Sequence, residues 1–403
     1  MELHVKTPAR AYLTGRFFDG ISSGLFMMAL PWIMLSTPHM GVFVALVALV
    51  CTVVSFVLTP FFSTLIDRCS RKNILILVQV VQSGSAAVVA LVYGLGYASN
   101  WLLAAAQLVF WVSGNVAWTT NHAFTQENFH PQEYASISGK QEVTMQATTL
   151  GSGALGVVLL QTWGMFEFSI FAAMASAIAI ICYLLCPYRR QLQLRHSAAL
   201  SFVRQLIESR MIFTQQPHFY LFLMLSALCY PILTFLDKLV PIWFAQMGIS
   251  GDWFAGYEIS FSMGSLVTGL FISRLLRIGP YPSIILVAMG LAAVMLIGMS
   301  ISASLPLLMV FTFFFGLLNA LNRIARVNMM HHRIDIGQRG RAEGGLKMFS
   351  NLAQSLSYVV IALLSHFDFI HLGFFIAAAV LVVSVMIMVR LHRRPDLVVS
   401  MAS

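Results

Sequence analysis

The chain has 403 residues, of which 59% are hydrophobic and only 10% are charged, against about 25% charged residues in soluble globular domains. So few charges exclude a large water-soluble protein, and so many apolar residues exclude a disordered chain. The bilayer remains as the solvent. Because a spanning helix takes about 20 apolar residues, a chain with twelve spans has no room for a sizeable soluble domain.

Apolar runs between charged and turn residues predict twelve membrane-spanning helices. In chain order they fall at 11–35, 41–66, 73–96, 101–123, 139–162, 168–187, 218–246, 253–275, 281–302, 304–327, 343–365 and 369–391. Only the connections at 124–138 and 188–217 are long. We therefore predict an N-terminal six-helix bundle at 1–187, a cytoplasmic linker at 188–217 and a C-terminal six-helix bundle at 218–403.

The linker contains apolar residues at helical spacing, with polar residues on the other side. This pattern predicts a helix lying along the membrane surface; the alternative is a simple tether between the bundles. The apolar residues are Phe202, Val203, Leu206 and Ile207.

Lysine and arginine mark one side of the predicted membrane. Of the 24 basic residues, only Lys238 falls outside an alternating set of connections, as expected when positive charge stays in the cytoplasm. We therefore expect both termini in the cytoplasm. The net charge of +9 then reflects topology, so we expect no nucleic-acid partner. Short outer connections favour a bacterial inner membrane.

Four charged residues surround the connection between the second and third spans: Asp67, Arg68, Arg71 and Lys72. The spacing resembles the Gly-x-x-x-Asp-Arg-x-Gly-Arg-Arg/Lys signature of the major facilitator superfamily, with Ser63 and Ser70 in place of the two glycines. The resemblance implies an all-α membrane protein with twelve transmembrane helices in two pseudo-symmetric six-helix bundles. A carboxylate among basic groups can latch neighbouring helix ends in one conformation and release them in another. The alternative is that the basic residues only set the topology.

Two further stretches resemble the enterobactin-exporter and macrolide-efflux subgroup. They are Glu127 through Ala135 and Arg339-Gly340-Arg341-Ala342-Glu343. They lie about 200 residues apart, and Gly114 and Gly316 hold like places, as expected of two parallel six-span repeats. Two features of drug–proton antiporters are missing: the stretch starting at Ser152 lacks their proline, and Phe110 stands near the place of their fourth-span arginine.

Charged residues inside spans are costly and normally face a cavity or a partner. Arg16 and Asp19 lie three residues apart in the first span, close enough to pair on one helix face. The following stretch from Gly20 to Gly24 is rich in small residues, which allow close helix packing. Asp19 is our leading candidate for a substrate or proton site; the alternative is a structural ion pair.

The seventh span carries Asp237 and Lys238 between Pro231 and Pro241. Adjacent residues point to different sides of a helix, and two prolines predict a bent or broken helix, such as transporters use around their sites. We expect both charges to face a cavity, with Glu258 as a possible partner. Glu142 is a further candidate in the fifth span.

Polar and aromatic residues elsewhere in the spans are candidates to line a substrate cavity: Asn115, Trp118, Asn121, Tyr230, Asn319, Asn322 and Arg323. Each asparagine can equally join helix to helix. His331 with His332, and His366 with Asp368, are expected to be solvated loop residues. They lack the spacing of metal ligands, and the chain has no phosphate-binding loop. We expect no metal, no cofactor and no enzyme activity.

Together these patterns predict a monomeric secondary transporter that works by alternating access. We expect it to export a small organic compound, of the siderophore or amphipathic drug type, as an antiporter coupled to protons. One alternative is an inward transporter of a nutrient or an iron chelate. The other is a membrane sensor or assembly partner that transports nothing.

Overall fold

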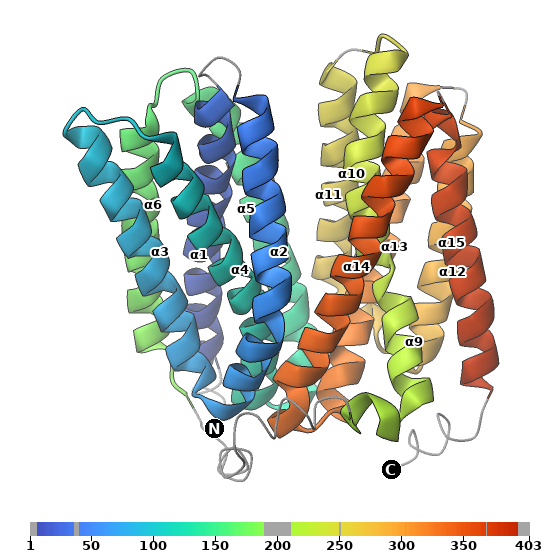
Figure 1. The fold of residues 1–403 in the computed structure, drawn as a ribbon. Helices are drawn as coiled ribbons and strands as arrows, with labels where there is room; N and C mark the ends of the chain where they lie inside the picture. Colours follow the sequence, from blue (N-terminus) through green and yellow to red (C-terminus); the bar gives the residue numbers. More distant parts are fainter. Residues whose placement is uncertain are drawn as a thin grey trace. The chain divides into compact units, whose positions relative to one another are not determined.

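The computed structural model describes residues 6–35, 40–188, 211–249, 251–302, 304–367 and 369–393. Within these ranges the chain is almost entirely helical and contains no β-strand (Figure 1). The expected all-α fold is therefore confirmed. The predicted surface helix of the linker, at 202–207, lies outside the described residues.

The chain divides into two compact units. Unit 1 comprises Met1–His130, Thr144–Leu206 and Asp335–Gly344, and unit 2 comprises Pro131–Val143, Ile207–Ile334 and Gly345–Ser403. Each unit thus follows one half of the chain but takes up a short segment from the other half. Because of this exchange, α5 (Tyr134–Leu159) begins in unit 2 and continues in unit 1, whereas α14 (Arg339–His366) begins in unit 1 and continues in unit 2.

Six long helices of the N-terminal half of the chain form most of unit 1, although η1 and the start of α5 belong to unit 2. They are α1 (Lys6–Leu35), α2 (Gly41–Arg68), α3 (Arg71–Gly94), α4 (Asn100–Asn128), α5 (Tyr134–Leu159, with the 3-10 turn η1 at Pro131–Glu133 before it) and α6 (Met165–Leu185). The helix α3 packs against both α4 and α6, and α2 packs against α4.

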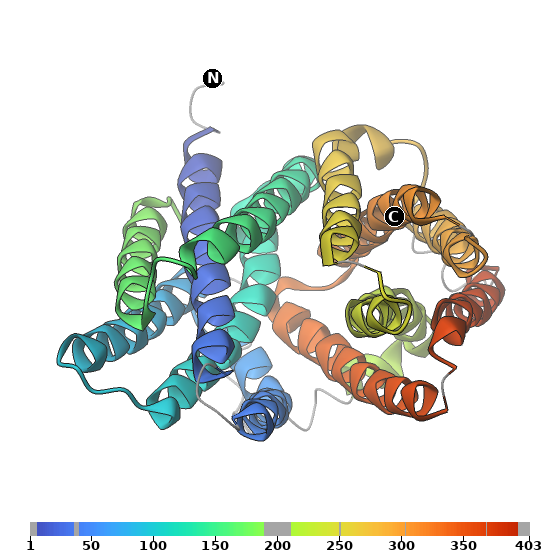
Figure 2. The same ribbon diagram turned by 90° about the horizontal axis from the view of Figure 1, so that it is seen from above.

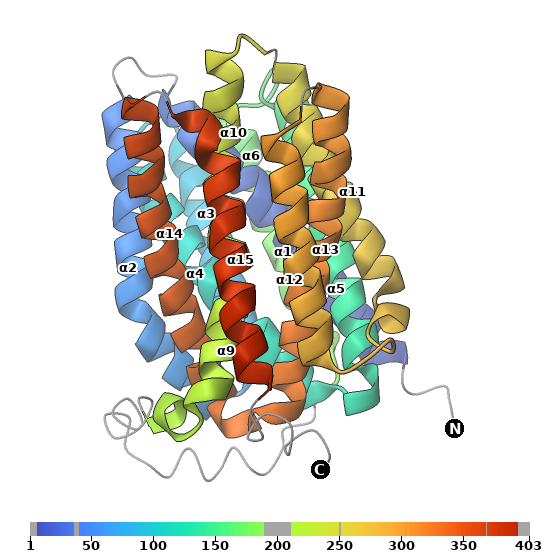
Figure 3. The same ribbon diagram turned by 90° about the vertical axis from the view of Figure 1, so that its right-hand side faces the viewer.

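Unit 2 repeats this arrangement. Its helices are α9 (Pro217–Ala227), α10 (Cys229–Gln246), α11 (Gly251–Leu275), α12 (Tyr281–Ser300), α13 (Leu305–Arg333), α14 (Arg339–His366, after η2 at Ile336–Gln338) and α15 (Gly373–His392, after η3 at Ile370–Leu372). The helix α12 packs against α13 and α15, and α11 packs against α13 (Figure 3). These are the counterparts of the α3 and α2 contacts, as expected of two repeats.

Twelve spans result, because α9 and α10 together form the seventh. Among the described residues, nine spans, including Pro217–Phe244 as one, are long and apolar enough to cross a membrane by length and composition. The other three spans are formed by α5, α11 and α14. Helices in lipid satisfy their own backbone hydrogen bonds, and the outward faces carry exposed apolar side chains such as Leu49, Val57 and Phe375.

The interruption between α9 and α10 falls at Leu228. Pro231 has no amide hydrogen and its ring disfavours the preceding helical turn, so the predicted break is present, just before the first proline. Next to the break, the carbonyl of Ser226 accepts hydrogen bonds from Asn322 Nδ2 at 2.9 Å and Arg326 NH1 at 2.7 Å. Both side chains come from α13, which therefore stabilises the broken helix.

Two expected boundaries are wrong. The helix α4 continues to Asn128 and α5 begins at Tyr134, so 124–138 is not a long connection. Likewise, α13 continues to Arg333, so His331 and His332 are helical; their rings lie 4.8 and 5.3 Å from the ring of Tyr134. Hydropathy detects lipid-facing residues, whereas these polar helix ends are covered by other parts of the protein.

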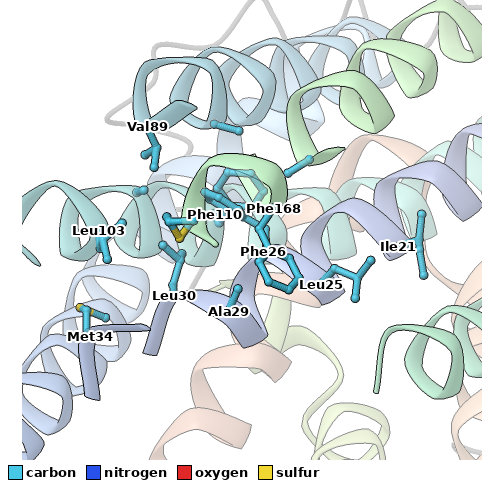
Figure 4. Close-up of a cluster of buried hydrophobic side chains, with 14 residues drawn as sticks. Ile21, Leu25, Phe26, Ala29, Leu30, Met34, Val89, Leu103, Phe110 and Phe168 are labelled. Atoms are coloured by element: carbon cyan, nitrogen blue, oxygen red, sulfur yellow. The ribbon is translucent and has the colours of Figure 1, made fainter. Parts of the chain in front are cut away.

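The core of unit 1 is apolar and aromatic (Figure 4). The rings of Phe26 on α1 and Phe110 on α4 lie 4.6 Å apart, and Phe168 on α6 is fully buried beside them. Phe110 thus occupies a packing position, which gives a physical reason for an apolar residue at this place in the fourth span.

The small residues of α1 allow close packing, as expected. A Cβ atom at Gly24 would lie 2.5 Å from Ser152 Oγ on α5, and one at Gly20 would lie 2.6 Å from Thr148 Oγ1. On the opposite side, Ser22 Oγ donates to the carbonyl of Ala172 on α6 at 2.9 Å. The backbone of α1 is therefore held closely between two helices of unit 1.

Gly24→Leu should lower the thermal unfolding temperature of the purified protein, because a side chain at this position overlaps Ser152 and forces α1 and α5 apart. Gly84→Leu is the matched control, since nothing lies within 4 Å of a Cβ atom there. Equal unfolding temperatures for the two variants would show that the α1–α5 contact does not limit stability.

Candidate functional site

A fully buried carboxylate, that of Asp67 at the end of α2, holds the start of α14 within unit 1. Its Oδ1 accepts from the Gly340 amide at 2.6 Å, and its Oδ2 accepts from the amide and the Nε of Arg341 at 3.1 and 3.2 Å. The first amides of a helix have no intrahelical acceptor and carry partial positive charge. Asp67 therefore caps α14 from another helix.

Close approach makes this cap possible. A Cβ atom at Gly340 would lie 2.5 Å from the carbonyl oxygen of Ser63 and 2.8 Å from Asp67 Oδ1. A Cβ atom at Gly344, one turn later, would overlap Ser63 Oγ. Glycine at both positions and serine at 63 allow α14 to reach the carboxylate.

Arg71 completes the environment of Asp67. Its guanidinium lies 3.8 Å from Asp67 Oδ1 and 3.5 Å from Glu127 Oε2, and all three side chains are buried. It also donates to the carbonyl of Ile336. One arginine thus joins α2, α3 and α4 to the segment that precedes α14.

The other two predicted latch residues lie elsewhere. Lys72 Nζ donates to the carbonyls of Leu184 and Cys186, each at 2.8 Å, and so caps the end of α6. Arg68 is half-buried in the last turn of α2. Asp67 and Arg71 thus converge on the start of α14, whereas Lys72 binds the end of α6.

The serines that replace the signature glycines have structural roles of their own. Ser70 is the N-cap of α3 and accepts from the Asn73 amide at 3.3 Å, with φ −62° and ψ 117°. Because these angles are open to any residue, the connection needs no glycine, and the serine adds a helix cap.

Tyr188 is a residue of this network that sequence reasoning missed. Its hydroxyl donates to Glu127 Oε2 at 2.6 Å and accepts from the Arg71 amide at 3.2 Å. Its ring stacks on Phe124 with 6.0 Å between centroids. Burial, and then the Glu127 carboxylate, raise the pKa of Tyr188 to about 12, so the hydroxyl remains a donor at physiological pH. No local sequence pattern singled out Tyr188.

The charged pair of α1 forms as predicted and extends into a longer network. Arg16 NH1 lies 3.0 Å from Asp19 Oδ2, and Gln79 Nε2 donates to Asp19 Oδ1 at 2.7 Å. Further hydrogen bonds join Gln79 to Gln82 and Gln82 to Ser113. Asp19 is only 5% exposed, so its two oxygens are satisfied inside unit 1. The two glutamines, three apart on α3, were the available signal for this network.

The polar residues of α4 have separate partners. Asn121 accepts from the hydroxyl of Tyr12 at 2.9 Å and donates to the carbonyl of Ala117. Asn115 donates to the carbonyl of Trp111 at 2.9 Å. Asn121 therefore joins α4 to α1, whereas the hydrogen bond of Asn115 stays within α4.

Trp118 reaches the start of α14 through a histidine. Its ring lies 5.3 Å from that of His122, whose Nδ1 lies 3.0 Å from Glu343 Oε1. The other carboxylate oxygen of Glu343 lies 3.3 Å from Arg339 NH2. The start of α14 therefore has a second polar attachment in unit 1, besides Asp67.

In unit 2, the structure pairs two predicted residues with each other: Glu142 of α5 forms a salt bridge with Arg323 of α13. Asn322 is fully buried and binds Ser226, as described above, and Asn319 is also buried. Nearby, the amide of Asn328 donates to Ser138 Oγ at 3.1 Å, which gives the first turns of α5 a second attachment to α13.

The charged residues of the seventh and eighth spans differ from the residues above in their lack of salt bridges within the described part of the chain. Asp237 and Glu258 are half-buried and Lys238 is exposed. They lie within electrostatic range of one another, but none forms a salt bridge within the described part of the chain. Close by, Tyr257 is 1% exposed, and its hydroxyl has no hydrogen-bond partner there. Tyr230 lies under the ammonium of Lys347, 4.8 Å from the ring centroid.

Comparison with known proteins agrees with this architecture. The model of the Major Facilitator Superfamily matches residues 12–276 and 245–400. The chain therefore belongs to this superfamily, and it is a multi-pass membrane protein and a secondary transporter of small molecules. No curated protein sequence matches it significantly.

Solved structures share the fold at low sequence identity. The human organic anion transporter TETRAN is 14% identical with a TM-score of 0.76, over 96% of this chain and 100% of that one. A bacterial homologue of the iron transporter ferroportin is 16% identical with a TM-score of 0.73, over 96% and 99%. The E. coli fucose:proton symporter FucP is 12% identical with a TM-score of 0.73, over 97% and 100%. The resemblance to the enterobactin-exporter and macrolide-efflux subgroup stays a prediction.

Asp67→Asn should speed hydrogen exchange at the backbone amides of Gly340 and Arg341. The carboxylate of Asp67 accepts from these two amides and from Arg341 Nε, and in asparagine an NH2 group, which cannot accept, replaces one of its two oxygens. Exchange followed by mass spectrometry on the peptide covering 337–344 measures this. Asp19→Asn removes another buried carboxylate of unit 1 and should leave that peptide unchanged. Equal exchange in wild type and Asp67→Asn would contradict the capping role.

Tyr188→Phe should lower the unfolding free energy by about 1–3 kcal/mol, since it removes a buried donor to a carboxylate. Because the pKa of Tyr188 is about 12, the loss should be the same at pH 6 and pH 9. Thermal unfolding of both proteins at the two pH values measures it. Tyr97→Phe, at an exposed tyrosine, is the control; a similar loss there would assign the effect to something other than the Glu127 contact.

Proposed function

We propose that this transporter exports a small organic compound across the bacterial inner membrane, in exchange for protons, as a monomer. The compound is of the siderophore or amphipathic drug type. The observation that carries the proposal is the pair of carboxylates in the seventh and eighth spans, which no salt bridge within the described residues neutralises. Charged groups in a membrane protein are retained where they face a cavity, a substrate or an ion.

The coupling proton has two candidate sites. Asp19 is held by Arg16 and Gln79 and is nearly inaccessible, which suits a structural ion pair. Asp237 and Glu258 lie on α10 and α11, which pack against each other. We assign proton binding to Asp237 and Glu258, because one proton there relieves the repulsion between two carboxylates.

The Asp67 network is proposed as the conformational latch. The cap on α14 involves amides, a guanidinium and a carboxylate, which can separate and re-form without a change in covalent structure. Because α14 begins in unit 1 and continues in unit 2, release of its first turn would allow alternating access.

Inward transport is the second candidate. The fucose:proton symporter with this fold moves a sugar together with protons, and a carboxylate pair serves symport as well as antiport. A non-transporting sensor is disfavoured, because it would have no need for carboxylates without a counterion inside the spans.

Asp237→Asn and Glu258→Gln should each abolish transport that is driven by a pH gradient. Each variant replaces a carboxylate by an amide, which cannot bind and release the proton. Asp19→Asn should lower stability and retain coupling. In inverted vesicles with an acidic lumen, a pH-sensitive dye reports protons released on addition of enterobactin, erythromycin or tetraphenylphosphonium.

Right-side-out vesicles in the same assay separate the directions: export predicts uphill accumulation in inverted vesicles only. Loss of coupling in Asp19→Asn, with normal coupling in Asp237→Asn, would move the proton site to α1. Accumulation in right-side-out vesicles alone would replace export by import, and no probe-dependent flux in either would favour the sensor.

A further inference from the structure

Two arginines at the end of α11 carry positive charge that nearby residues do not balance. Arg274 lies in the last turn of α11 and Arg277 in the connection to α12, and both side chains are exposed. Within the described residues, neither guanidinium forms a salt bridge or a side-chain hydrogen bond. The local sequence offers no counterion either, because residues 259–334 contain no aspartate and no glutamate.

The second repeat keeps the spacing of these arginines but lacks the carboxylate of the first. The two arginines are spaced like Arg68 and Arg71 of unit 1, which lie about 200 residues earlier, as expected of parallel repeats. In unit 1, Asp67 directly precedes this pair, and its Oδ1 lies 3.8 Å from Arg71 NH2. The residue at the equivalent place in unit 2 is Ser273. Unit 2 therefore has the cationic part of this charged motif and no anion of its own beside it.

The guanidinium of Arg274 is turned toward the membrane-spanning part of α11. It lies over the ring of Phe271, 6.0 Å from the ring centroid, and this ring is exposed on the outside of the helix. Arginines near the end of a span usually extend their charge toward water. Here the charge rests on an apolar ring about one turn inside the helix, which places it where lipid headgroups meet the acyl chains.

Apolar side chains lie on both sides of the two charges. Leu270 is exposed in α11, and Ile278 is 78% exposed in the connection to α12. Figure 2 shows this connection, in yellow-orange, at the margin of unit 2. Two arginines between exposed apolar residues suit a molecule that has both a phosphate and hydrocarbon chains.

We propose that Phe271, Arg274, Arg277 and Ile278 form a binding site for an anionic phospholipid. The guanidinium groups present planar sets of N–H donors that match the phosphate oxygens, and Phe271 and Ile278 contact the acyl chains. The bound lipid then supplies the negative charge that Asp67 supplies at the equivalent place in unit 1. This site is separate from the sites of the substrate and the proton in the proposed function.

Helix electrostatics and topology give the alternative account of these arginines. Basic residues near the end of a helix interact favourably with its dipole, and positive charge keeps a connection in the cytoplasm. Neither role requires a lipid, and both apply equally to Arg390 and Arg393 at the end of α15. Those arginines are also exposed and three residues apart, so they provide a matched control.

Thermal unfolding of the purified full-length protein in an uncharged detergent tests the proposal, because a ligand of the folded state raises the unfolding temperature. Phosphatidylglycerol and phosphatidylcholine with identical acyl chains are added at increasing mole fractions. We expect phosphatidylglycerol to raise the unfolding temperature to a plateau and phosphatidylcholine to leave it nearly unchanged. Glycerol 3-phosphate, which has the phosphate but no acyl chain, distinguishes a lipid from a free phosphate compound and should have no effect.

The variants separate a specific site from general positive charge. Arg274→Gln combined with Arg277→Gln should weaken the apparent affinity for phosphatidylglycerol by about tenfold or more, through the loss of charged contacts. Arg390→Gln combined with Arg393→Gln removes the same charge from the same end of unit 2 (Figure 3) and should leave the affinity unchanged. Arg274→Lys keeps the charge without the planar group, so it should weaken binding by less than the first double variant. The unfolding temperature of each variant in detergent alone controls for folding.

Three results would overturn the inference: equal stabilisation by phosphatidylcholine, an equal loss of affinity in the two double variants, or equal stabilisation by glycerol 3-phosphate. The first would show a general effect of lipid, the second an effect of total charge, and the third a site for a soluble phosphate compound. Since the measurement requires neither a substrate nor a pH gradient, its failure is distinguishable from failure of the proposed export.

Discussion

The buried carboxylate of Asp67 is the contact on which the account of this transporter depends. It accepts hydrogen bonds from Gly340 and Arg341 and so keeps the first turn of α14 in unit 1, while the rest of that helix belongs to unit 2. A carboxylate removed from water must be fully paired to be tolerated. Because a buried carboxylate must be fully paired, the contact is stable only when the amides of Gly340 and Arg341 and the guanidinium groups are all in place. A contact that is stable in one arrangement only is suited to act as a conformational latch.

The other intramembrane charges follow the same rule, with one exception. Asp19 is satisfied by Arg16 and a glutamine, and Glu142 by Arg323. Asp237 and Glu258 have no such partner within the described residues. Ion pairs stabilise a bundle, whereas two carboxylates without a counterion favour the binding of a positively charged species such as a proton. We therefore propose that carboxylates with a counterion in the protein stabilise the structure, and that carboxylates without one take part in transport.

Hydropathy predicted the twelve spans because lipid contact requires long apolar helices. Local spacing also predicted the Arg16–Asp19 pair and the break near Pro231. The ends of α4 and α13 were missed, since their last turns are polar yet covered by protein. Contacts between distant segments carry no local signal: the charged motif indicated a latch at Asp67 without its partner in α14, and nothing indicated the hydroxyl of Tyr188.

Reversible cross-linking of Ser63→Cys and Gly344→Cys tests the central claim, that the contact around Asp67 opens during transport. A Cβ atom at Gly344 would lie 2.7 Å from that of Ser63, closer than the about 3.8 Å of disulfides, so α14 must shift by about 1 Å to form the bridge, and flux of the reduced double variant is the control for that shift. The pair is placed in a protein whose five cysteines, Cys51, Cys69, Cys182, Cys186 and Cys229, are replaced by serine. Proton release from inverted vesicles is then followed before and after reduction. We expect no flux in the oxidised protein and full flux after reduction. Undiminished flux with the cross-link complete would contradict it.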